Sequence, residues 1–448
     1  MSAVVLNEEQ AVAHIHGICL KTGPPRRVGV ELEWLVRDVH DPAVPVSPQR
    51  IAAAIAGFRA RETGITRSPA LPSSAAPAVL PSGALLTTEP GGQLEVSSLP
   101  ADNLADCVTA TAADLAALRS AVAAADLELA GIGLDPYRTP LRVLRLPRYA
   151  AMEAFFDRGG PWGRQMMCGT ASVQICLDAG DDSGSFSGYR YRWRLLHSIG
   201  PILVAAFANS PLRGGRLTGW RSSRQQTWAS MDTARTRPPA MTGDPQASWA
   251  SYALDAQVMC IRSEGDDWTA PADLTFRGWV RGGGRRDDGI SARVGRAPTE
   301  ADLDYHLSTL FPPVRPRGHL EIRMIDAQPG DSWVVPLAVT SALLADERAA
   351  DLAMAAAGRV WNSEPKGEWP PDSGSAASDA DNPWTRAARC GPSDAAIARA
   401  SRESFAAARE ALARQQAPSS IREAVDAFID AYVTRNRCPA DDLIEESA

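Results

Sequence analysis

Lysine is almost absent from this 448-residue chain, in which Lys21 and Lys366 are the only two. No GxxxxGK[ST] loop occurs, so the lysine that such a loop places beside bound phosphates has no counterpart. Any handling of phosphate groups must therefore depend on arginine, metal ions and backbone amides. The excess of arginine, with much Ala, Gly and Pro, is more typical of a GC-rich genome than of a particular function.

Cysteine pairs and long apolar runs are also missing. The seven cysteines are scattered, without CxxC spacing, which predicts reduced thiols in a cytoplasm rather than a disulfide framework or a zinc site. The longest apolar stretch, near residues 199–208, contains Gly200 and Pro201 and is too short to span a bilayer. No basic segment followed by an apolar core opens the sequence, so we expect no secretory signal.

Positive charge is outweighed by negative charge, and the net charge of −7 disfavours a general role in binding nucleic acid. With 45% hydrophobic residues, the chain can bury a large core. Length alone would suggest two or three domains, but large mixed α/β enzymes of this size often form one unit. We predict a single domain over 1–448, with a mobile loop at 361–389, a helical C-terminal part at 392–436 and a disordered tail from 441.

Amphipathic patterns with capping residues predict several helices. The main ones are expected at 7–20, 102–129, 148–156, 187–208, 332–357, 392–415 and 419–435.

The stretch His319–Asp326 has the pattern of a strand with one buried face. Leu320 and its i+2 neighbours are apolar, whereas Glu321 and Arg323 share the other face because they stand two residues apart. A carboxylate there suits a divalent cation, and a guanidinium suits a phosphate oxygen. Taken alone, the pair is better explained by an exposed ion pair on that face.

Acidic residues recur on other predicted strands. In the strand 28–36, Glu31 and Glu33 share one face, where they repel each other unless a cation lies between them. Glu89 and Glu95 flank a Pro-Gly-Gly turn that brings their carboxylates together. The alternative is that these are solvated acids on strand edges and in an ordinary hairpin.

A further strand is predicted over Met166–Asp178, with a polar face that includes Gln174, whose carbonyl oxygen suits a hard cation. All the candidate ligands carry oxygen, which favours Mg²⁺ or Mn²⁺ over zinc, and their number implies two or more ions. Several cations beside an arginine indicate phosphoryl transfer from ATP. The candidate ligands are Glu31, Glu33, Glu89, Glu95, Gln174 and Glu321.

Several motifs in order resemble the glutamate–cysteine ligases of the plant and proteobacterial type, and most closely the actinobacterial branch that serves ergothioneine biosynthesis. The resemblance covers about residues 28–345. It implies an α+β, glutamine-synthetase-like catalytic fold: a curved, mainly antiparallel sheet that forms a funnel, with helices packed outside. The motifs are Gly29-x-Glu31-x-Glu33, Glu89-Pro90-Gly91-Gly92-Gln93-x-Glu95, Thr170-x-x-x-Gln174-x-x-x-Asp178, Phe207-Ala208-Asn209-Ser210-Pro211 and Leu320-Glu321-x-Arg323.

The resemblance also implies roles for individual residues. One metal set is Glu33, Glu89 and Glu95, and another is Glu31, Gln174 and Glu321. Arg323 corresponds to a contact with the γ-phosphate of ATP. Glutamine synthetase itself has a histidine at the position of Gln174, which argues for the cysteine ligases. The implied substrate-binding residues are Arg148, Tyr149, Met152, Thr170, Arg224, Trp228 and Arg235.

Without the resemblance, surface arginines stacked on tryptophan would explain the Arg/Trp-rich stretch near 219–235 equally well.

The implied activity is ATP-dependent joining of the γ-carboxylate of L-glutamate to the amine of L-cysteine through γ-glutamyl phosphate. We expect a cytoplasmic monomer that binds these small molecules and neither nucleic acid nor a membrane. Two alternatives remain at this point: a ligase of the same fold that uses another amine, and a non-catalytic protein that binds ATP or an amino acid.

Overall fold

An antiparallel sheet forms the centre of the computed structural model, which describes residues 6–58, 77–241, 243–282, 294–361 and 382–447. Its eight strands run in the order β2-β3-β4-β1-β6-β10-β9, with β5 paired to the later part of β1. The strands are β1 (Val28–Asp38), β2 (Ala78–Val79), β3 (Leu85–Thr88), β4 (Leu94–Ser97), β5 (Leu127–Ala130), β6 (Ser172–Leu177), β9 (Val314–Pro316) and β10 (Leu320–Asp326). Two short strands, β7 (Leu212–Arg213) and β8 (Arg216–Leu217), pair separately.

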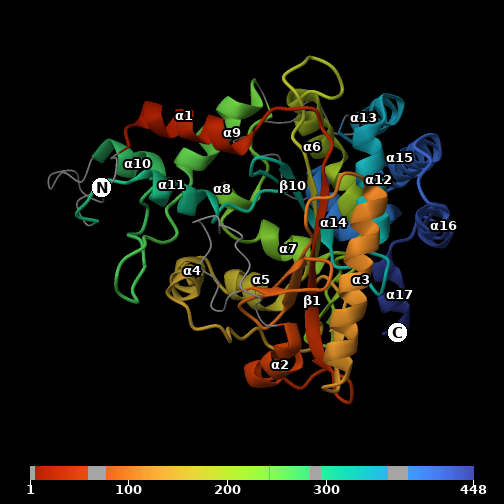
Figure 1. Ribbon diagram of the computed structural model, residues 1–448, viewed down its shortest axis with the longest axis horizontal. Helices are drawn as coiled ribbons and strands as arrows, with labels where there is room; N and C mark the ends of the chain where they lie inside the picture. The colour runs from red at the N-terminus through yellow and green to blue at the C-terminus, as the bar shows by residue number, and fades with distance from the viewer. Residues whose placement is uncertain (1–5, 59–76, 242, 283–293, 362–381, 448) are drawn as a thin grey trace.

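Helices lie on both sides of this sheet (Figure 1). The N-terminal and central helices are α1 (Glu8–Cys19), α2 (Pro48–Ala54), α3 (Leu104–Ala123), α4 (Pro147–Asp157), α5 (Trp162–Gly169), α6 (Tyr189–Ala206), α7 (Ser223–Ala229), α8 (Thr233–Thr236), α9 (Pro245–Asp255), α10 (Phe276–Gly282) and α11 (Glu300–Leu307). The C-terminal helices are α12 (Val334–Ala345), α13 (Glu347–Trp361), α14 (Pro383–Cys390), α15 (Ala395–Arg414), α16 (Ser419–Phe428) and α17 (Pro439–Glu446). The predicted α+β class is confirmed.

Capping residues set the starts of the predicted helices. The side chain of Asn7 accepts a hydrogen bond from the backbone N–H of Gln10, and Asn103 does the same for Asp106. These bonds satisfy donors that the first turn of a helix leaves unpaired. The helix predicted at 102–129 ends earlier than expected, at Ala123, because the chain turns there to form β5.

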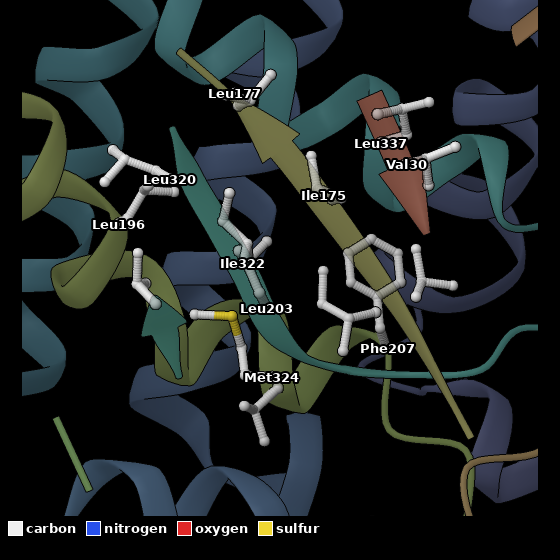
Figure 2. Packing of buried hydrophobic residues seen from close by; sticks show 14 of the residues in the cluster. Val30, Ile175, Leu177, Leu196, Leu203, Phe207, Leu320, Ile322, Met324 and Leu337 are labelled. Atoms are coloured by element: carbon white, nitrogen blue, oxygen red, sulfur yellow. The ribbon is translucent and has the colours of Figure 1, made fainter. Parts of the chain in front are cut away.

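The apolar face of the sheet packs against α6 and α12 (Figure 2). Period-2 alternation places its side chains on one side, and they are almost wholly buried. The sheet contributes Val30, Ile175, Leu177, Leu320, Ile322 and Met324, and the helices contribute Leu196, Leu203 and Leu337, with Phe207 at the C-cap of α6. This packing fixes the three central strands, so the polar residues between these positions must project from the opposite face.

Figure 1 shows the two groups of helices on either side of β1. The helices α3, α12, α13, α15 and α16 gather on one side, and α4, α5 and α7 lie on the other. The polar face of the sheet is therefore bordered by short helices from the middle of the chain.

Two sequence-based assignments were wrong in part. The strand predicted over Met166–Asp178 begins only at Ser172, because Met166 to Gly169 form the last turns of α5. The run Met166-Met167-Cys168 is apolar without strand alternation, and it packs in a cluster with Phe155 and Phe156. The predicted tail begins inside a helix: residues 441–446 belong to α17, whose Asp441 pairs with Arg221 at 2.7 Å.

The loop predicted at 361–389 also needs correction at its ends. Trp361 is the last residue of α13, and Pro383–Cys390 form α14. Residues 362–381 lie outside the part of the chain that the structure describes. In the described residues, no helix is long and apolar enough to cross a membrane.

Two helical glycines provide a test of how α14 packs on α6. A Cβ at Gly200 would lie 2.0 Å from Cη2 of Trp384, whereas a Cβ at Gly358 in α13 would meet nothing within 4 Å. We expect Gly200→Ala to destabilise the protein by about 1–3 kcal/mol through overpacking. Gly358→Ala should stabilise it by about 0.5–1 kcal/mol by restricting the unfolded chain. Thermal unfolding measures both, and equal midpoints for the two variants would contradict this packing.

Candidate active site

Strand pairing brings the predicted metal ligands together on the polar face. Glu33 of β1 lies directly opposite Glu95 of β4, and Glu31 lies opposite Gln174 of β6. Directly opposed residues in antiparallel strands have Cβ atoms about 4.5–5.5 Å apart. Three strands that are distant in sequence thus place their acidic and amide side chains within contact range of one another.

The turn after β3 adds Glu89 to this face. It closes with a bond from the N–H of Gly92 to the carbonyl of Glu89, 2.8 Å long. The neighbouring Gly91 is required, because a Cβ there would lie 2.2 Å from the carbonyl oxygen of Cys168. Gln93 fixes the turn further by donating its amide to the carbonyl of Thr170 at 2.9 Å.

Neutral donors hold two of the carboxylates. Ser172 and Gln174 donate hydrogen bonds to the two oxygens of Glu33, each 2.9 Å long. Thr87 donates to Glu95 at 3.1 Å. Such donors orient a carboxylate but add no positive charge, so the repulsion between neighbouring acids remains.

This repulsion appears in the pKa values of the carboxylates. Burial raises the pKa of Glu89 to about 7, and the charge of Glu33 adds to the rise. The pKa of Glu31 is raised mainly by burial and then by the negative charge of Glu321. The pKa of Glu95 is raised well above its ordinary value, again mainly by burial and then by the charge of Glu89. In the metal-free protein, the acidic face is therefore short of positive charge.

Glu321 has the opposite environment. It is fully buried and accepts two hydrogen bonds of 2.8 Å from the guanidinium of Arg315, with Arg317 at 3.7 Å. Burial alone would raise its pKa, but Arg315, Arg323 and Arg317 together hold the pKa of Glu321 well below its usual range. This carboxylate is charged and already paired.

Arg323 connects the two environments. Its Nη1 donates to Glu321 and to the side-chain oxygen of Gln174, whose amide nitrogen donates to Glu33. The predicted proximity of Glu321 and Arg323 on one face is confirmed. Arg323 also lies near the ring of Phe311, at 5.9 Å from its centroid.

The fit of this site to metal ions depends on the chemistry of its donors. Among the described residues, no group of three or more His, Cys, Asp or Glu side chains is arranged to hold a metal ion. The raised pKa values of Glu31, Glu89 and Glu95 nevertheless mark a surplus of carboxylate that a divalent cation would relieve. The donor set fits a hard cation, and the assignment of its six ligands stays a prediction.

The predicted substrate residues of α4 border the acidic face. Tyr149 is close enough to Glu89 for that carboxylate to raise its pKa further, after burial. Arg148 is buried and donates to the hydroxyl and carbonyl oxygens of Ser308 at 3.1 and 3.2 Å. Met152 packs into the apolar cluster with the phenylalanines of α4.

Of the other predicted substrate residues, Arg224 is buried, and its Nη1 lies 3.7 Å from Oδ1 of Asp326. Its Nε has no hydrogen-bond partner among the described residues. Trp228, on the same helix, lies 5.9 Å from the guanidinium carbon of Arg224. Arg235 is fully occupied by protein groups, since it donates to Asp232, Thr309 and Gln257.

Thr170 donates its hydroxyl to the carbonyl of Met166 at 2.6 Å, at the end of α5. The structure thus gives Thr170 and Arg235 structural partners, while Tyr149 and Arg224 border the acidic face.

A surface pocket of about 520 Å³ lies beside α4 and away from the predicted ligands. It is lined by Arg142, Arg145, Glu153 and Asp266 with apolar neighbours. None of the predicted site residues lines it, so it contributes nothing to the chemistry described above.

The glutamate-cysteine ligase family 2 (GCS2) matches residues 27–447. The chain belongs to this family. It is 38% identical over 445 residues to the glutamate–cysteine ligase EgtA of Mycobacterium tuberculosis (strain CDC 1551 / Oshkosh), covering 98% of this chain and 90% of the relative. Family membership, predicted from motifs between 28 and 345, therefore extends through the C-terminal helices.

More distant relatives match less of the chain. The chloroplastic glutamate–cysteine ligase of Medicago truncatula is 29% identical over 249 residues, which are 54% of this chain and 47% of the relative. A solved bifunctional glutathione synthetase from Pasteurella multocida has a TM-score of 0.50 and 12% identity, covering 98% of this chain and 51% of that chain. The likeness to this last protein is one of fold alone.

Sequence reasoning missed three residues that shape this ligase site. Arg315 and Arg317 surround Glu321, and Asp326 accepts hydrogen bonds from the segment that precedes α7. The Arg-Pro-Arg run two residues before β10 was an available signal for the arginines. Asp326 ends a strand that the sequence did predict, but its partners lie more than 100 residues away, and no local pattern reveals them.

The pKa of Glu89 gives a test of the carboxylate surplus. A folded-state value of about 7 against an ordinary 4.5 means that its contribution to stability is lost as the pH rises from about 4.5 through about 7. In metal-free protein at pH 8, Glu89→Gln should therefore be more stable than the wild type, on the order of 1 kcal/mol after solvent screening. Thermal unfolding from pH 4.5 to 8 measures this difference.

The difference should shrink toward pH 4.5, where Glu89 is protonated in the folded state and about half protonated in the unfolded state. The exposed Glu264→Gln serves as the control and should show no such trend. A constant difference across the pH range would show that folding does not raise the pKa of Glu89.

Proposed function

We propose that the protein catalyses ATP-dependent ligation of the γ-carboxylate of L-glutamate to the amine of L-cysteine, giving γ-glutamylcysteine, ADP and phosphate. The observation that carries this proposal is the division of charge on one sheet face in a member of the glutamate–cysteine ligase family. Unpaired acids lie on β1, the β3–β4 turn and β4, while Arg315, Arg317 and Arg323 lie on or beside β9 and β10.

The acidic side of this face suits cations, and the arginine side suits phosphate. We assign Glu33, Glu89 and Glu95 to one ion and Glu31, Gln174 and Glu321 to another, with Mg²⁺ favoured and Mn²⁺ as the alternative. Glu321 would share the second ion with the arginines that pair with it in the metal-free protein. When bound, these ions neutralise the charge of the triphosphate and so favour attack at the γ-phosphorus. A pKa of about 7 for Glu89 allows it to ionise near neutral pH as a cation arrives.

Arg323 lies at the boundary between the acidic residues and the arginines, where it can contact the transferring phosphoryl group. One of its nitrogens contacts Gln174 and Glu321, and a guanidinium carries five N–H donors in all. Donors held in place by a strand cost little reorganisation as negative charge develops on the phosphoryl oxygens. The ion pair with Glu321 orients Arg323 for this role.

The reaction has two steps in this scheme. The side-chain carboxylate of glutamate attacks the γ-phosphorus of ATP, which gives γ-glutamyl phosphate and ADP. The amine of cysteine then attacks the acyl carbon, the bond to phosphate breaks, and the amine loses a proton. Tyr149 and Arg224 border the face where this occurs. The Nε of Arg224, which has no hydrogen-bond partner among the described residues, suits a substrate carboxylate.

The cellular setting forms part of the proposal. We propose a cytoplasmic monomer that binds small molecules and no nucleic acid, and whose product enters ergothioneine biosynthesis. The similarity to the mycobacterial EgtA ligase over 98% of this chain supports the assignment to that branch.

Arg323→Ala should lower kcat by about 10²–10³, because the contact strengthens as charge develops in the transition state. Arg323→Lys should recover only part of the loss, since lysine keeps the charge but not the planar fork. Steady-state kinetics with ATP varied measures the effect. An increase in the KM for ATP at unchanged kcat would remove Arg323 from the chemical step.

The reaction itself is tested by ADP release from ATP and Mg²⁺, with glutamate present and amines added in turn, and with products identified by mass. We expect release to require both glutamate and cysteine, with γ-glutamylcysteine formed. Turnover with a different amine would overturn the choice of cysteine. ATP binding without turnover for any amine would show a non-catalytic binding protein instead.

A further inference from the structure

Arg323 lies in an irregular part of β10. Ile322 pairs with Ile175, and Ile325 pairs with Val173, so two residues of β10 lie opposite one residue of β6. This extra residue creates a β-bulge, which consists of Arg323 and Met324. A bulge interrupts the ladder locally and changes the direction in which its side chains project.

Bulged residues lose regular pairing, so their backbone groups need other partners. The N–H of Arg323 donates to the carbonyl of Pro313 at 2.8 Å. The two carbonyls are bonded by side chains of α7: Arg224 Nη2 donates to the carbonyl of Arg323, and Gln225 Nε2 donates to that of Met324, each at 2.8 Å. Adjacent residues of one helix therefore hold adjacent residues of the bulge.

The start of α7 is itself fixed to β10. Ser222, its N-cap, accepts the N–H of Gln225 at 3.1 Å and donates its hydroxyl to Asp326 at 2.9 Å. The same carboxylate accepts the hydroxyl of Ser210 at 2.7 Å. Asp326 is 2% exposed, so these bonds are shielded from water. The first turn of α7 is thus bonded both to the bulge and to Asp326, which lies two residues beyond it.

We propose that Gln225 is a positioning residue for Arg323. The inference deepens the proposed function and depends on it, because it assigns Arg323 the phosphoryl contact. Among the described residues, the side chain of Gln225 forms no hydrogen bond with Glu321 or the acidic face, and its link to the chemistry is the bond that it donates to the carbonyl of Met324. Without that bond, the bulge relaxes and the guanidinium of Arg323 leaves the orientation that its contacts with Gln174 and Glu321 define.

Gln225→Leu tests this link, because leucine keeps much of the volume but cannot donate. Gln226→Leu is the matched control: Gln226 is the next residue of α7, is also partly buried, and accepts a bond from Arg213 at 3.0 Å instead of contacting β10. We expect Gln225→Leu to lower kcat for ligation about tenfold with little change in the KM for ATP, which corresponds to about 1.4 kcal/mol. Gln226→Leu should stay within about twofold of the wild type.

A double-mutant cycle separates positioning from general damage. If Gln225 acts through Arg323, the loss caused by Gln225→Leu should fall below about twofold in an Arg323→Lys background. An equal loss in both backgrounds, or a loss no larger than that of Gln226→Leu, would overturn the proposal.

Hydrogen exchange gives a readout that does not depend on the reaction. The amide of Arg323 should exchange about tenfold faster in Gln225→Leu than in Gln226→Leu, because the bulge opens more often. Unchanged exchange would overturn the inference even in a fully active enzyme. If the wild type fails to ligate but the exchange difference appears, the proposed function is wrong and the coupling between Gln225 and the bulge stands.

Discussion

Repulsion among carboxylates on one face of the sheet is the constraint on which the rest of the site depends. Glu33 faces Glu95 across the β1–β4 pair, and burial with neighbouring charge raises the pKa of Glu89 to about 7. The opposite faces of β1 and β4 bury Val30, Leu32, Leu94 and Val96 in the hydrophobic core, part of which is shown in Figure 2. This burial holds the two strands in the register that keeps the acids together. Favourable packing on one side thus maintains unfavourable electrostatics on the other, an arrangement typical of sites that bind cations.

Positive charge is distributed unevenly over this face. Three arginines surround Glu321, while the acids of β1 and β4 have only neutral donors in direct contact. The boundary between the two regions lies at Gln174, which donates to Glu33 and accepts from Arg323. A nucleotide triphosphate with its cations combines both charges, and it complements both regions at once.

Local sequence pattern predicted much of this fold and site. Alternation in β1 and β10 identified the buried face, and the acids at the intervening positions were found from the same period of two. The apolar run at Met166 was assigned to a strand together with the alternating residues 170–178 that follow it. The run itself does not alternate, and it is helical in the structure, where it packs with Phe155 and Phe156. The bulge at Arg323 and the bonds from α7 could not be predicted, because they depend on how segments about 100 to 150 residues apart pair and pack.

The central claim is that the acidic face holds protons which a cation displaces. Calorimetric titration of Mg²⁺ into protein with a non-hydrolysable ATP analogue, near pH 6.5 and in buffers of different ionisation enthalpy, measures the protons released on binding. We expect the protein to release about one proton, because carboxylates with raised pKa values must ionise to bind the metal. Tight binding without proton release, or no binding of Mg²⁺, would contradict it.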